Sequence, residues 1–271
     1  MCSLVTKYRP QTLSDIHGQS WIVEQLTAFS EQPHSCAFIF HGATGTGKTS
    51  TAVALARALG VAVEHEELGG FHQIASGEQT GETVRRTMDG LRFRTMYGSG
   101  RKVLVVNEAD VMTPNASHVW LDALESLPAR TIVIFTTNAI GKLPRRLQDR
   151  CEAMEFMSAA MMLRPDMDTF AREVWQKETG RDDCPDLDTL GKLADENGDA
   201  SFRRLLQSLE APIRSAKTSQ PAKQSPATPN TIDEPKCEKS KTNAKKRTAK
   251  PVAEWKPLPV ELQPRRRTCK S

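Results

Sequence analysis

A run of eight residues, Gly42-Ala43-Thr44-Gly45-Thr46-Gly47-Lys48-Thr49, has the composition of a phosphate-binding loop. It fits the pattern G-x-x-x-x-G-K-[ST], whose glycines let backbone N–H groups approach phosphate oxygens. An apolar run at 36–40 reads as the preceding strand, and 49–59 reads as the following helix, whose N-terminus adds partial positive charge. The pattern predicts that Lys48 reaches the β- and γ-phosphates and that Thr49 ligates Mg²⁺. The ATP-binding residues predicted here are Gly42, Ala43, Thr44, Gly45, Thr46, Gly47, Lys48, Thr49 and Ser50.

An acidic cluster, Asn107-Glu108-Ala109-Asp110, follows a second apolar run at 103–106. In ATPase sites of this kind the first position helps to hold Mg²⁺, and the second polarises the attacking water. The first position is Asn107, whose amide can accept a hydrogen bond from Mg²⁺-bound water but adds no negative charge. We therefore predict Thr49 and Asn107 as the metal residues and Glu108 as the catalytic base.

Thr136-Thr137-Asn138 ends a third apolar run at 131–135. Side chains at the carboxyl ends of parallel strands face the crevice where α/β sheets bind ligands. Asn138 is therefore predicted to position the water between Glu108 and the γ-phosphate.

The elements that would hold these residues alternate between apolar strands and amphipathic helices. Strands are expected at 36–40, 61–63, 103–106 and 131–135, and helices at 21–29, 49–59, 82–93 and 115–124. This alternation indicates a parallel sheet with helices on both faces. After residue 156 the strand signals stop, and helices are expected at 168–179, 186–195 and 200–209. The predicted domains are an α/β domain at 1–156, a small all-α lid at 157–216 and a disordered basic tail at 217–271.

Charge separates the tail from the rest of the chain. The segment 217–271 holds 14 of the 37 Lys and Arg residues but five acidic residues, so its net charge is +9 and that of the remainder is −5. With few aliphatic residues the tail cannot bury enough surface to fold. Its clusters Lys245-Lys246-Arg247 and Arg265-Arg266-Arg267 are compatible with phosphate contacts or with a solubilising role. Trp255 lies in a proline-flanked apolar island that could dock on a partner.

Other function classes receive no support from the composition. The six cysteines lack C-x-x-C spacing, so neither a zinc module nor a redox motif is indicated. The N-terminus lacks the apolar run of a signal peptide, and no stretch approaches the roughly 18 apolar residues of a membrane span. We expect a soluble cytoplasmic, nucleoid-associated or nuclear protein that is not secreted.

Taken in order, these motifs resemble the AAA+ clamp loaders, most closely the small subunits of replication factor C and of phage clamp loaders. Lys7-Tyr8-Arg9-Pro10 is similar to the N-terminal signature of that family, and Asn107-Glu108-Ala109-Asp110-Val111-Met112-Thr113 to its D-E-A-D-x-M-T run. The likeness covers roughly residues 5–212. It implies a P-loop AAA+ fold with a helical lid, bound ATP and Mg²⁺, and an adenine that lies against Tyr8, Arg9 and Pro10.

The resemblance also implies roles for three further residues. Asn138 becomes the first nucleotide sensor, and Arg150, in Gln148-Asp149-Arg150-Cys151, becomes a finger that reaches the ATP of a neighbouring subunit. The helix at 200–207 resembles the second-sensor helix, in which Arg203 is the best candidate to touch the γ-phosphate and Arg204 is the alternative. Arg85 falls where the family has an arginine that faces the central chamber.

The sequence also departs from the family. Asn107 replaces aspartate, and Asp149 replaces the serine before the finger. Ser117 and Leu121-Asp122 replace the Gln and the paired arginines that couple DNA binding to hydrolysis. The family's helical collar, which assembles its pentamer, is replaced by the basic tail, so the resemblance does not by itself predict a ring.

Three functions remain open at this point. The first is a DNA-responsive ATPase in replication or repair, assembled with other AAA+ subunits and working on a sliding clamp and primer–template DNA. The second is a nucleotide-binding structural subunit with weak hydrolysis, which Asn107 favours. The third is an AAA+ ATPase that acts on a protein partner, which Asp122 favours. The intact Lys48, Glu108, Asn138 and Arg150 favour catalysis over the second.

Overall fold

The computed structural model describes residues 3–190, 193–194 and 198–218, apart from the side chain of Glu67. The strands are β1 (Cys36–His41), β2 (Phe71–Ile74), β3 (Lys102–Val106), β4 (Thr131–Thr137) and β5 (Glu152–Glu155). The helices are α1 (Leu4–Lys7), α2 (Ser20–Glu31), α3 (Lys48–Ala58), α4 (Glu66–Gly69), α5 (Gly81–Gly90), α6 (Pro114–Glu125), α7 (Arg145–Gln148), α8 (Ala160–Thr179) and α9 (Phe202–Thr218). Short 3-10 helices lie at Leu13–Asp15, Val63–His65, Ala109–Val111 and Ile140–Lys142.

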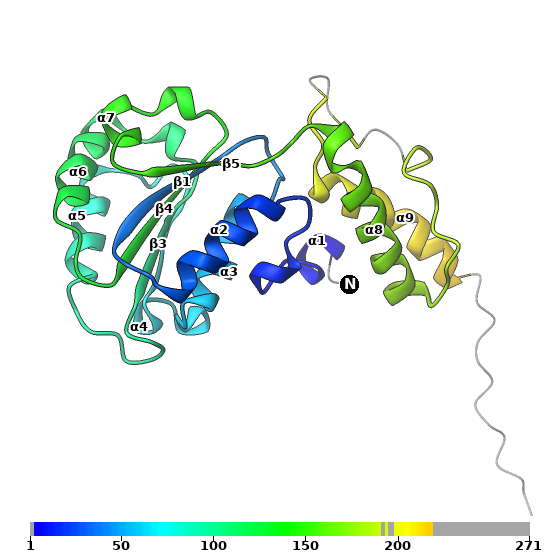
Figure 1. Cartoon of the computed structure of the whole chain (residues 1–271), viewed down its shortest axis with the longest axis horizontal. Coiled ribbons are helices and arrows are strands. Elements are labelled where there is room, and N and C mark those ends of the chain that lie inside the picture. Colours follow the sequence, from blue (N-terminus) through cyan, green and yellow to red (C-terminus); the bar gives the residue numbers. More distant parts are fainter. Residues whose placement is uncertain (1–2, 191–192, 195–197, 219–271) are drawn as a thin grey trace, which may run out of the picture. The chain divides into compact units, whose positions relative to one another are not determined.

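The strands form one parallel sheet in the order β2-β3-β4-β1-β5. β3 and β4 are buried along their whole length, which explains their continuous apolar sequence. Helices α2 and α3 cover one face, and α5, α6 and α7 cover the other (Figure 1). The structure therefore confirms the predicted α/β class with helices on both faces of the sheet.

Each face of the sheet has its own hydrophobic core because alternate strand residues point in opposite directions. Phe38 and Phe40 of β1 pack with Leu26 and Leu55 on one side. Ile39, the residue between them, belongs to the opposite cluster with the fully buried Trp120 of α6. The candidate site residues extend from the strand ends, and both cores hold these strand ends in place.

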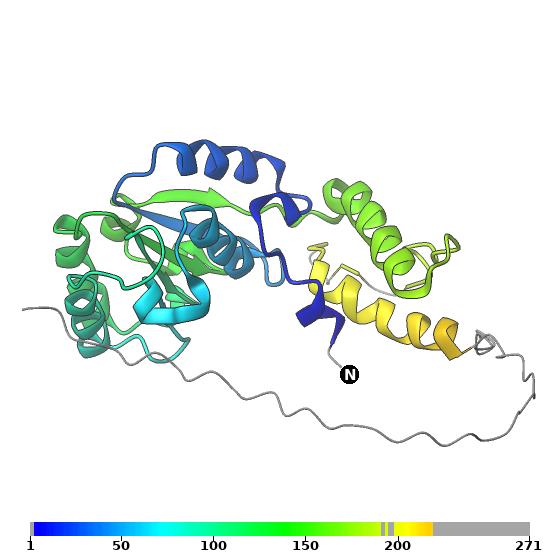
Figure 2. The same ribbon diagram turned by 90° about the horizontal axis from the view of Figure 1, so that it is seen from below.

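A third hydrophobic cluster joins α8 and α9, which lie side by side (Figure 2). Leu163, Val174 and Trp175 of α8 pack against Leu205 and Leu209 of α9. Leu4 of α1 belongs to the same cluster, so α1 packs with the lid helices. The domain limits at 156 and 216 stay predictions, and the described residues belong to one compact unit by their contacts.

The strand predicted at 61–63 is wrong. Gly60 has a φ of 75° and ends α3, and the N–H of Val61 donates to the carbonyl oxygen of Ala56 at 3.0 Å. Val61 is thus the apolar residue that follows a Schellman-type helix end. Its buried side chain gives the segment 61–63 an apolar character that resembles that of a strand. The second strand is instead β2, within a stretch whose residue pattern favours neither helix nor strand.

The helix predicted at 186–195 is also wrong for the part of it that the structure describes. Thr189 N–H donates to Asp186 O at 2.9 Å, which makes a single turn over residues 187–189. The helix predicted at 168–179 begins eight residues earlier, at Ala160, and includes Pro165. The predicted tail lies outside the described residues, except for Lys217 and Thr218, which are the last two residues of α9.

Among the described residues, no helix combines the length and apolar character that crossing a bilayer requires.

Candidate functional site

The carboxyl ends of three adjacent strands meet at one edge of the sheet. β4 lies between β3 and β1, with Val106 paired to Phe135 and Phe40 paired to Thr136. The residues that follow β1, β3 and β4 therefore open into the same crevice, where α/β sheets bind ligands. A cavity of about 490 Å³ lies there. Of the predicted site residues, those that line it are Tyr8, Arg9, Pro10, Thr44, Gly45, Thr46, Gly47, Lys48, Thr49, Ser50, Asn107, Glu108, Asn138 and Arg203.

Lys48 is the first residue of α3 and is 8% exposed. Its Nζ donates to the carbonyl oxygens of Gly42 and Ala43, each at 2.8 Å, and to Oδ1 of Asn138 at 2.9 Å. Burial, together with the neighbouring charge of Arg203, lowers the pKa of Lys48 to about 8, although Asp110 and Glu108 oppose the shift. Gly42 and Ala43 do not line the cavity, but their carbonyl groups orient the lysine that does.

Thr49 and Asn107 lie together on the cavity wall, as the prediction of a metal site requires. The hydroxyl of Thr49 donates to Oδ1 of Asn107 at 3.2 Å. Mg²⁺ usually takes one or two protein oxygens, and substrate phosphates and waters supply the rest. The two neutral oxygens fit such an ion when it is bound together with phosphate groups, which supply the negative charge that Thr49 and Asn107 lack. Among the described residues, no cluster of three His, Cys, Asp or Glu side chains forms a separate metal site.

Glu108 adopts a left-handed backbone conformation, with φ 51° and ψ 54°, which is unusual for a residue with a side chain. Its N–H donates to Oγ1 of Thr136 at 3.2 Å, and its carbonyl oxygen accepts from Nε2 of Gln79 at 3.1 Å. The hydroxyl of Ser76 donates to the Glu108 carboxylate at 2.5 Å. These bonds hold Glu108 in its strained conformation at the cavity. Strained backbone of this kind is common at functional sites.

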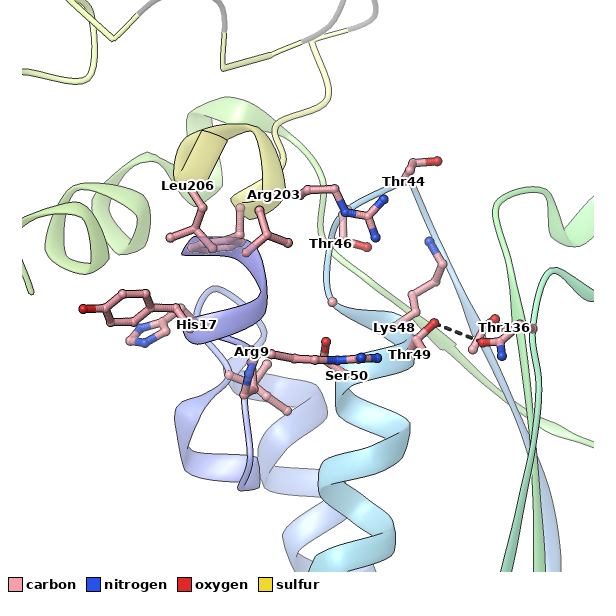
Figure 3. A pocket seen from close by; sticks show the side chains of 18 of the residues that line it. Arg9, His17, Thr44, Thr46, Lys48, Thr49, Ser50, Thr136, Arg203 and Leu206 are labelled. Carbon is pink, nitrogen blue, oxygen red and sulfur yellow. Dashed lines mark hydrogen bonds between the residues drawn. The ribbon is translucent and has the colours of Figure 1, made fainter. Parts of the chain in front are cut away.

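The lid contributes Arg203 to the same cavity. In Figure 3 the side chain of Arg203, from α9, extends toward that of Lys48, at the start of α3, and both line the cavity. Ser201, just before α9, donates from its hydroxyl to the carbonyl oxygen of Gly45 at 3.3 Å, which joins the lid to the loop. Arg203, and not Arg204, lines the cavity, so the geometry favours Arg203 of the two candidates.

Aromatic side chains form the opposite end of the cavity. The rings of Phe170 and His17 lie 4.6 Å apart, those of Phe170 and Phe202 5.8 Å, and those of Tyr8 and Phe170 6.4 Å. A wall of this kind suits the flat face of a nucleotide base. Sequence reasoning did not single out Phe170 because it is one apolar residue among many on α8, and only the packing of α8 beside α1 brings it to the cavity.

Arg150 does not line the cavity. It follows α7, where its guanidinium pairs with Glu125 of α6 and donates to the carbonyl oxygen of Arg146 at 2.9 Å. Its side chain is about one-third exposed. The structure thus places Arg150 apart from the other predicted catalytic residues, and its role toward a neighbouring subunit stays a prediction.

Residues 38–159 match the family described as "ATPase family associated with various cellular activities (AAA)". The chain is 32% identical over 168 residues to a replication factor C small subunit of Thermoplasma volcanium, an overlap that covers 62% of this chain and 50% of that protein. It is also 32% identical over 154 residues to replication factor C subunit 3 of Saccharomyces cerevisiae, covering 56% and 44%. The chain spans about half the length of the curated relatives that it matches.

A solved structure supports the fold. The Thermotoga maritima RuvB Holliday junction branch migration motor aligns with a TM-score of 0.54 at 15% identity, covering 74% of this chain and 63% of that chain. At this identity the likeness concerns the fold alone.

Proposed function

We propose that the chain is an ATPase of a clamp-loader-like assembly, because residues 38–159 match the AAA family and the chain is similar to the small subunits of replication factor C. In this proposal it hydrolyses ATP in response to DNA, together with other AAA+ subunits. The observation that carries the proposal is the convergence of Lys48, Glu108 and Arg203, from three separate elements, on one cavity.

The chemistry follows from the position of each group. Lys48 and the backbone N–H groups of the loop hold the β- and γ-phosphates, and Arg203 adds positive charge from the lid. Glu108 accepts a proton from the attacking water, which Asn138 orients from the end of β4. Thr49 and Asn107 would hold Mg²⁺ together with the nucleotide, and the ion would supply additional positive charge at the phosphates.

The neighbouring subunit completes the site in this proposal. Arg150 lies outside its own cavity and is about one-third exposed, so it can reach the nucleotide of an adjacent copy or related subunit. An arginine supplied in this way stabilises the charge of the transferring phosphoryl group. Hydrolysis should therefore depend on subunit concentration.

The test is steady-state ATP hydrolysis over a range of protein concentrations, with and without primer–template DNA. Lys48→Ala serves as the blank because it removes the ammonium that binds phosphate. Turnover that rises with concentration and with DNA supports the proposal. A turnover rate that does not change when DNA is added rules out DNA coupling for this chain alone. Nucleotide binding without turnover identifies a structural subunit.

A second candidate function is action on a protein partner, and an exposed apolar surface favours it. This surface consists of Leu68, Phe93, Met96 and Tyr97, which are 46–75% exposed. The N–H groups of Met96 and Tyr97 donate to the Leu68 carbonyl oxygen at 2.9 and 3.2 Å, so these three residues lie together, and Phe93 precedes Met96 by three residues in the chain. Contiguous exposed apolar side chains commonly mark protein contacts.

The same surface has a basic border in Arg92 and Arg94, both exposed, which suits an acidic partner surface. A purified ring-shaped clamp is the partner to test first, by pull-down with the double variant Phe93→Ser, Met96→Ser. Loss of capture with unchanged ATP binding supports a protein contact at this surface. Unchanged capture excludes it.

A further inference from the structure

Glu178, near the end of α8, is a buried carboxylate that the proposed phosphate chemistry does not use. Its side chain is 5% exposed. One oxygen accepts from Nζ of Lys7 at 2.5 Å and from the hydroxyl of Tyr8 at 2.9 Å, and the other accepts from Nζ of Lys217 at 2.5 Å. The hydrogen bonds from Lys217 and Lys7 lower the pKa of Glu178 to about 2, so the group is ionised at physiological pH.

The partners of Glu178 come from both ends of the described chain. Lys7 and Tyr8 belong to the N-terminal segment, and Lys217 to the end of α9. A second carboxylate, Glu210 of α9, accepts from the Ser3 hydroxyl at 2.7 Å and from the Leu4 N–H at 3.0 Å. The N-terminal segment is thus fastened to the lid helices at both of its ends, by Glu210 and by Glu178, while Leu4 is buried in the lid core.

Immediately after this anchor the chain crosses from the lid to the sheet. Tyr8, Arg9 and Pro10 line the nucleotide cavity, and Leu13 already belongs to the core beneath β1. Within the described residues the other crossing is at 156–160, because Phe156 packs in that same core and Leu163 in the lid. One wall of the cavity is therefore a stretch of chain whose first residue is fixed to the lid by Glu178.

We propose that Glu178 is a positioning residue for nucleotide binding, which holds Tyr8 and thereby the wall Tyr8-Arg9-Pro10 against the lid. This inference rests on the proposed function, since it concerns the same cavity. The wall then moves with α8 and α9, so that the base end of the nucleotide and Arg203 engage together. Removal of the carboxylate leaves two ammonium groups and a hydroxyl without their shared acceptor, which frees the segment.

The alternative is that Glu178 only stabilises the fold, and two variants separate the possibilities. Glu178→Gln keeps the shape but removes the charge, and Tyr8→Phe removes only the hydroxyl that faces Glu178. Glu173→Gln is the matched control, because Glu173 lies on the same helix in an exposed pair with Lys177. The measurements are ATP dissociation constants, kcat at saturating ATP, and amide hydrogen exchange of residues 4–8 in nucleotide-free protein.

We expect Glu178→Gln to raise the Kd for ATP about tenfold and Tyr8→Phe about threefold, as for the loss of charge-assisted hydrogen bonds. Residues 4–8 should exchange faster in Glu178→Gln, and kcat should stay within about twofold because Glu178 does not reach the phosphates. Glu173→Gln should change none of these values.

An unchanged Kd in both variants, with a lower melting temperature, overturns the positioning role and leaves the proposed function intact. Unchanged exchange of residues 4–8 in Glu178→Gln overturns it as well. If the wild-type chain binds no ATP, the proposed function fails and the positioning role fails with it. The absence of ATP binding by the wild-type chain distinguishes this outcome from failure of the positioning role alone. Amide hydrogen exchange of residues 4–8 still shows whether Glu178 anchors the segment.

Discussion

The ammonium group of Lys48 lies 2.9 Å from the amide oxygen of Asn138, so the phosphate-binding loop is bonded directly to the end of β4. The carbonyl oxygens of Gly42 and Ala43 accept the other two bonds, and three acceptors match the three protons of a lysine ammonium. A phosphate that binds Lys48 must replace at least one of them. Nucleotide binding is therefore expected to release or reorient Asn138, which links phosphate recognition to the residue that orients water.

The depressed pKa of Lys48 makes ATP affinity depend on pH. Burial lowers the pKa from 10.5 to about 8, and phosphate binding requires the protonated form. Above pH 8 the Kd for ATP should rise up to about tenfold per pH unit in wild-type protein. The sign is opposite for folding: the folded state holds fewer protons between pH 8 and 10.5, so the contribution of Lys48 to stability rises with pH in that range.

Equilibrium titration of nucleotide from pH 7 to 9.5 measures this effect. Lys48→Arg is the control, since an arginine stays protonated throughout. Its Kd should be nearly independent of pH even if its affinity is lower. A wild-type Kd that is flat across the range contradicts the assignment of Lys48 as the titrating phosphate ligand.

The contact between Gly45 and Ser201 predicts a steric coupling between loop and lid. A Cβ at Gly45 would lie 2.0 Å from the Ser201 hydroxyl oxygen, and the φ of Gly45 is 84°. Gly47 has a similar φ of 101°, but a Cβ there would meet no atom within 4 Å. Gly47→Ala should therefore cost only the backbone strain, about 1–2 kcal/mol, whereas Gly45→Ala should cost about 1–3 kcal/mol more.

Thermal or denaturant unfolding of nucleotide-free protein compares the two variants without interference from phosphate. Ser201→Gly in the Gly45→Ala background should recover most of the extra loss, because it removes the atoms that clash. Equal destabilisation by both alanine variants, or no recovery in the double variant, would show that the lid does not rest on the loop in solution.

The phosphate-binding half of the site could be predicted from the sequence because its information is local. Lys48, Asn107 and Asn138 each directly follow a glycine-rich or apolar run, and parallel strands must bring such ends together. The aromatic end could not be predicted in the same way. Phe170 reaches the cavity through the packing of α8 on α1 and α9, which no short pattern in the sequence records.

The edges of the sheet were missed for a different physical reason. β5 has only Met154 buried, since it is an edge strand with one neighbour, and so it lacks an apolar run. β2, at the other edge, is buried only at Phe71 and Ile74. Central strands are covered on both faces and are therefore visible in the sequence, whereas edge strands of four residues are not.

The position of Arg150 predicts complementation between two inactive variants. Arg150→Ala should bind ATP normally but lose about a thousandfold in kcat, because the charge on the transferring phosphoryl group is no longer stabilised. Lys48→Ala should be inactive because its own cavity cannot hold phosphate. In a mixture, a Lys48→Ala subunit still offers Arg150 to the intact cavity of an Arg150→Ala neighbour.

Mixing the two proteins should therefore restore measurable hydrolysis in an assembly of identical chains. Glu125→Gln is an informative companion, since Glu125 pairs with Arg150 in the free subunit and its loss should leave the finger more mobile without removing it. Wild-type kcat in Arg150→Ala alone would exclude a catalytic role for this residue.

Restoring the acid at position 107 should strengthen metal binding. Asn107→Asp has nearly the same shape, so the Thr49 hydroxyl still finds its acceptor at about the present 3.2 Å, and the new carboxylate adds a negative charge beside it. Mg²⁺ prefers carboxylate oxygen, so the Mg²⁺ concentration for half-maximal ATPase should fall about tenfold and kcat should rise. The double variant Asn107→Asp, Glu108→Gln separates the two effects, because it should keep the tighter metal dependence of ATP binding while losing turnover. An unchanged Mg²⁺ dependence in Asn107→Asp would mean that the side chain at 107 does not face the ion, and that the amide is compatible with full activity.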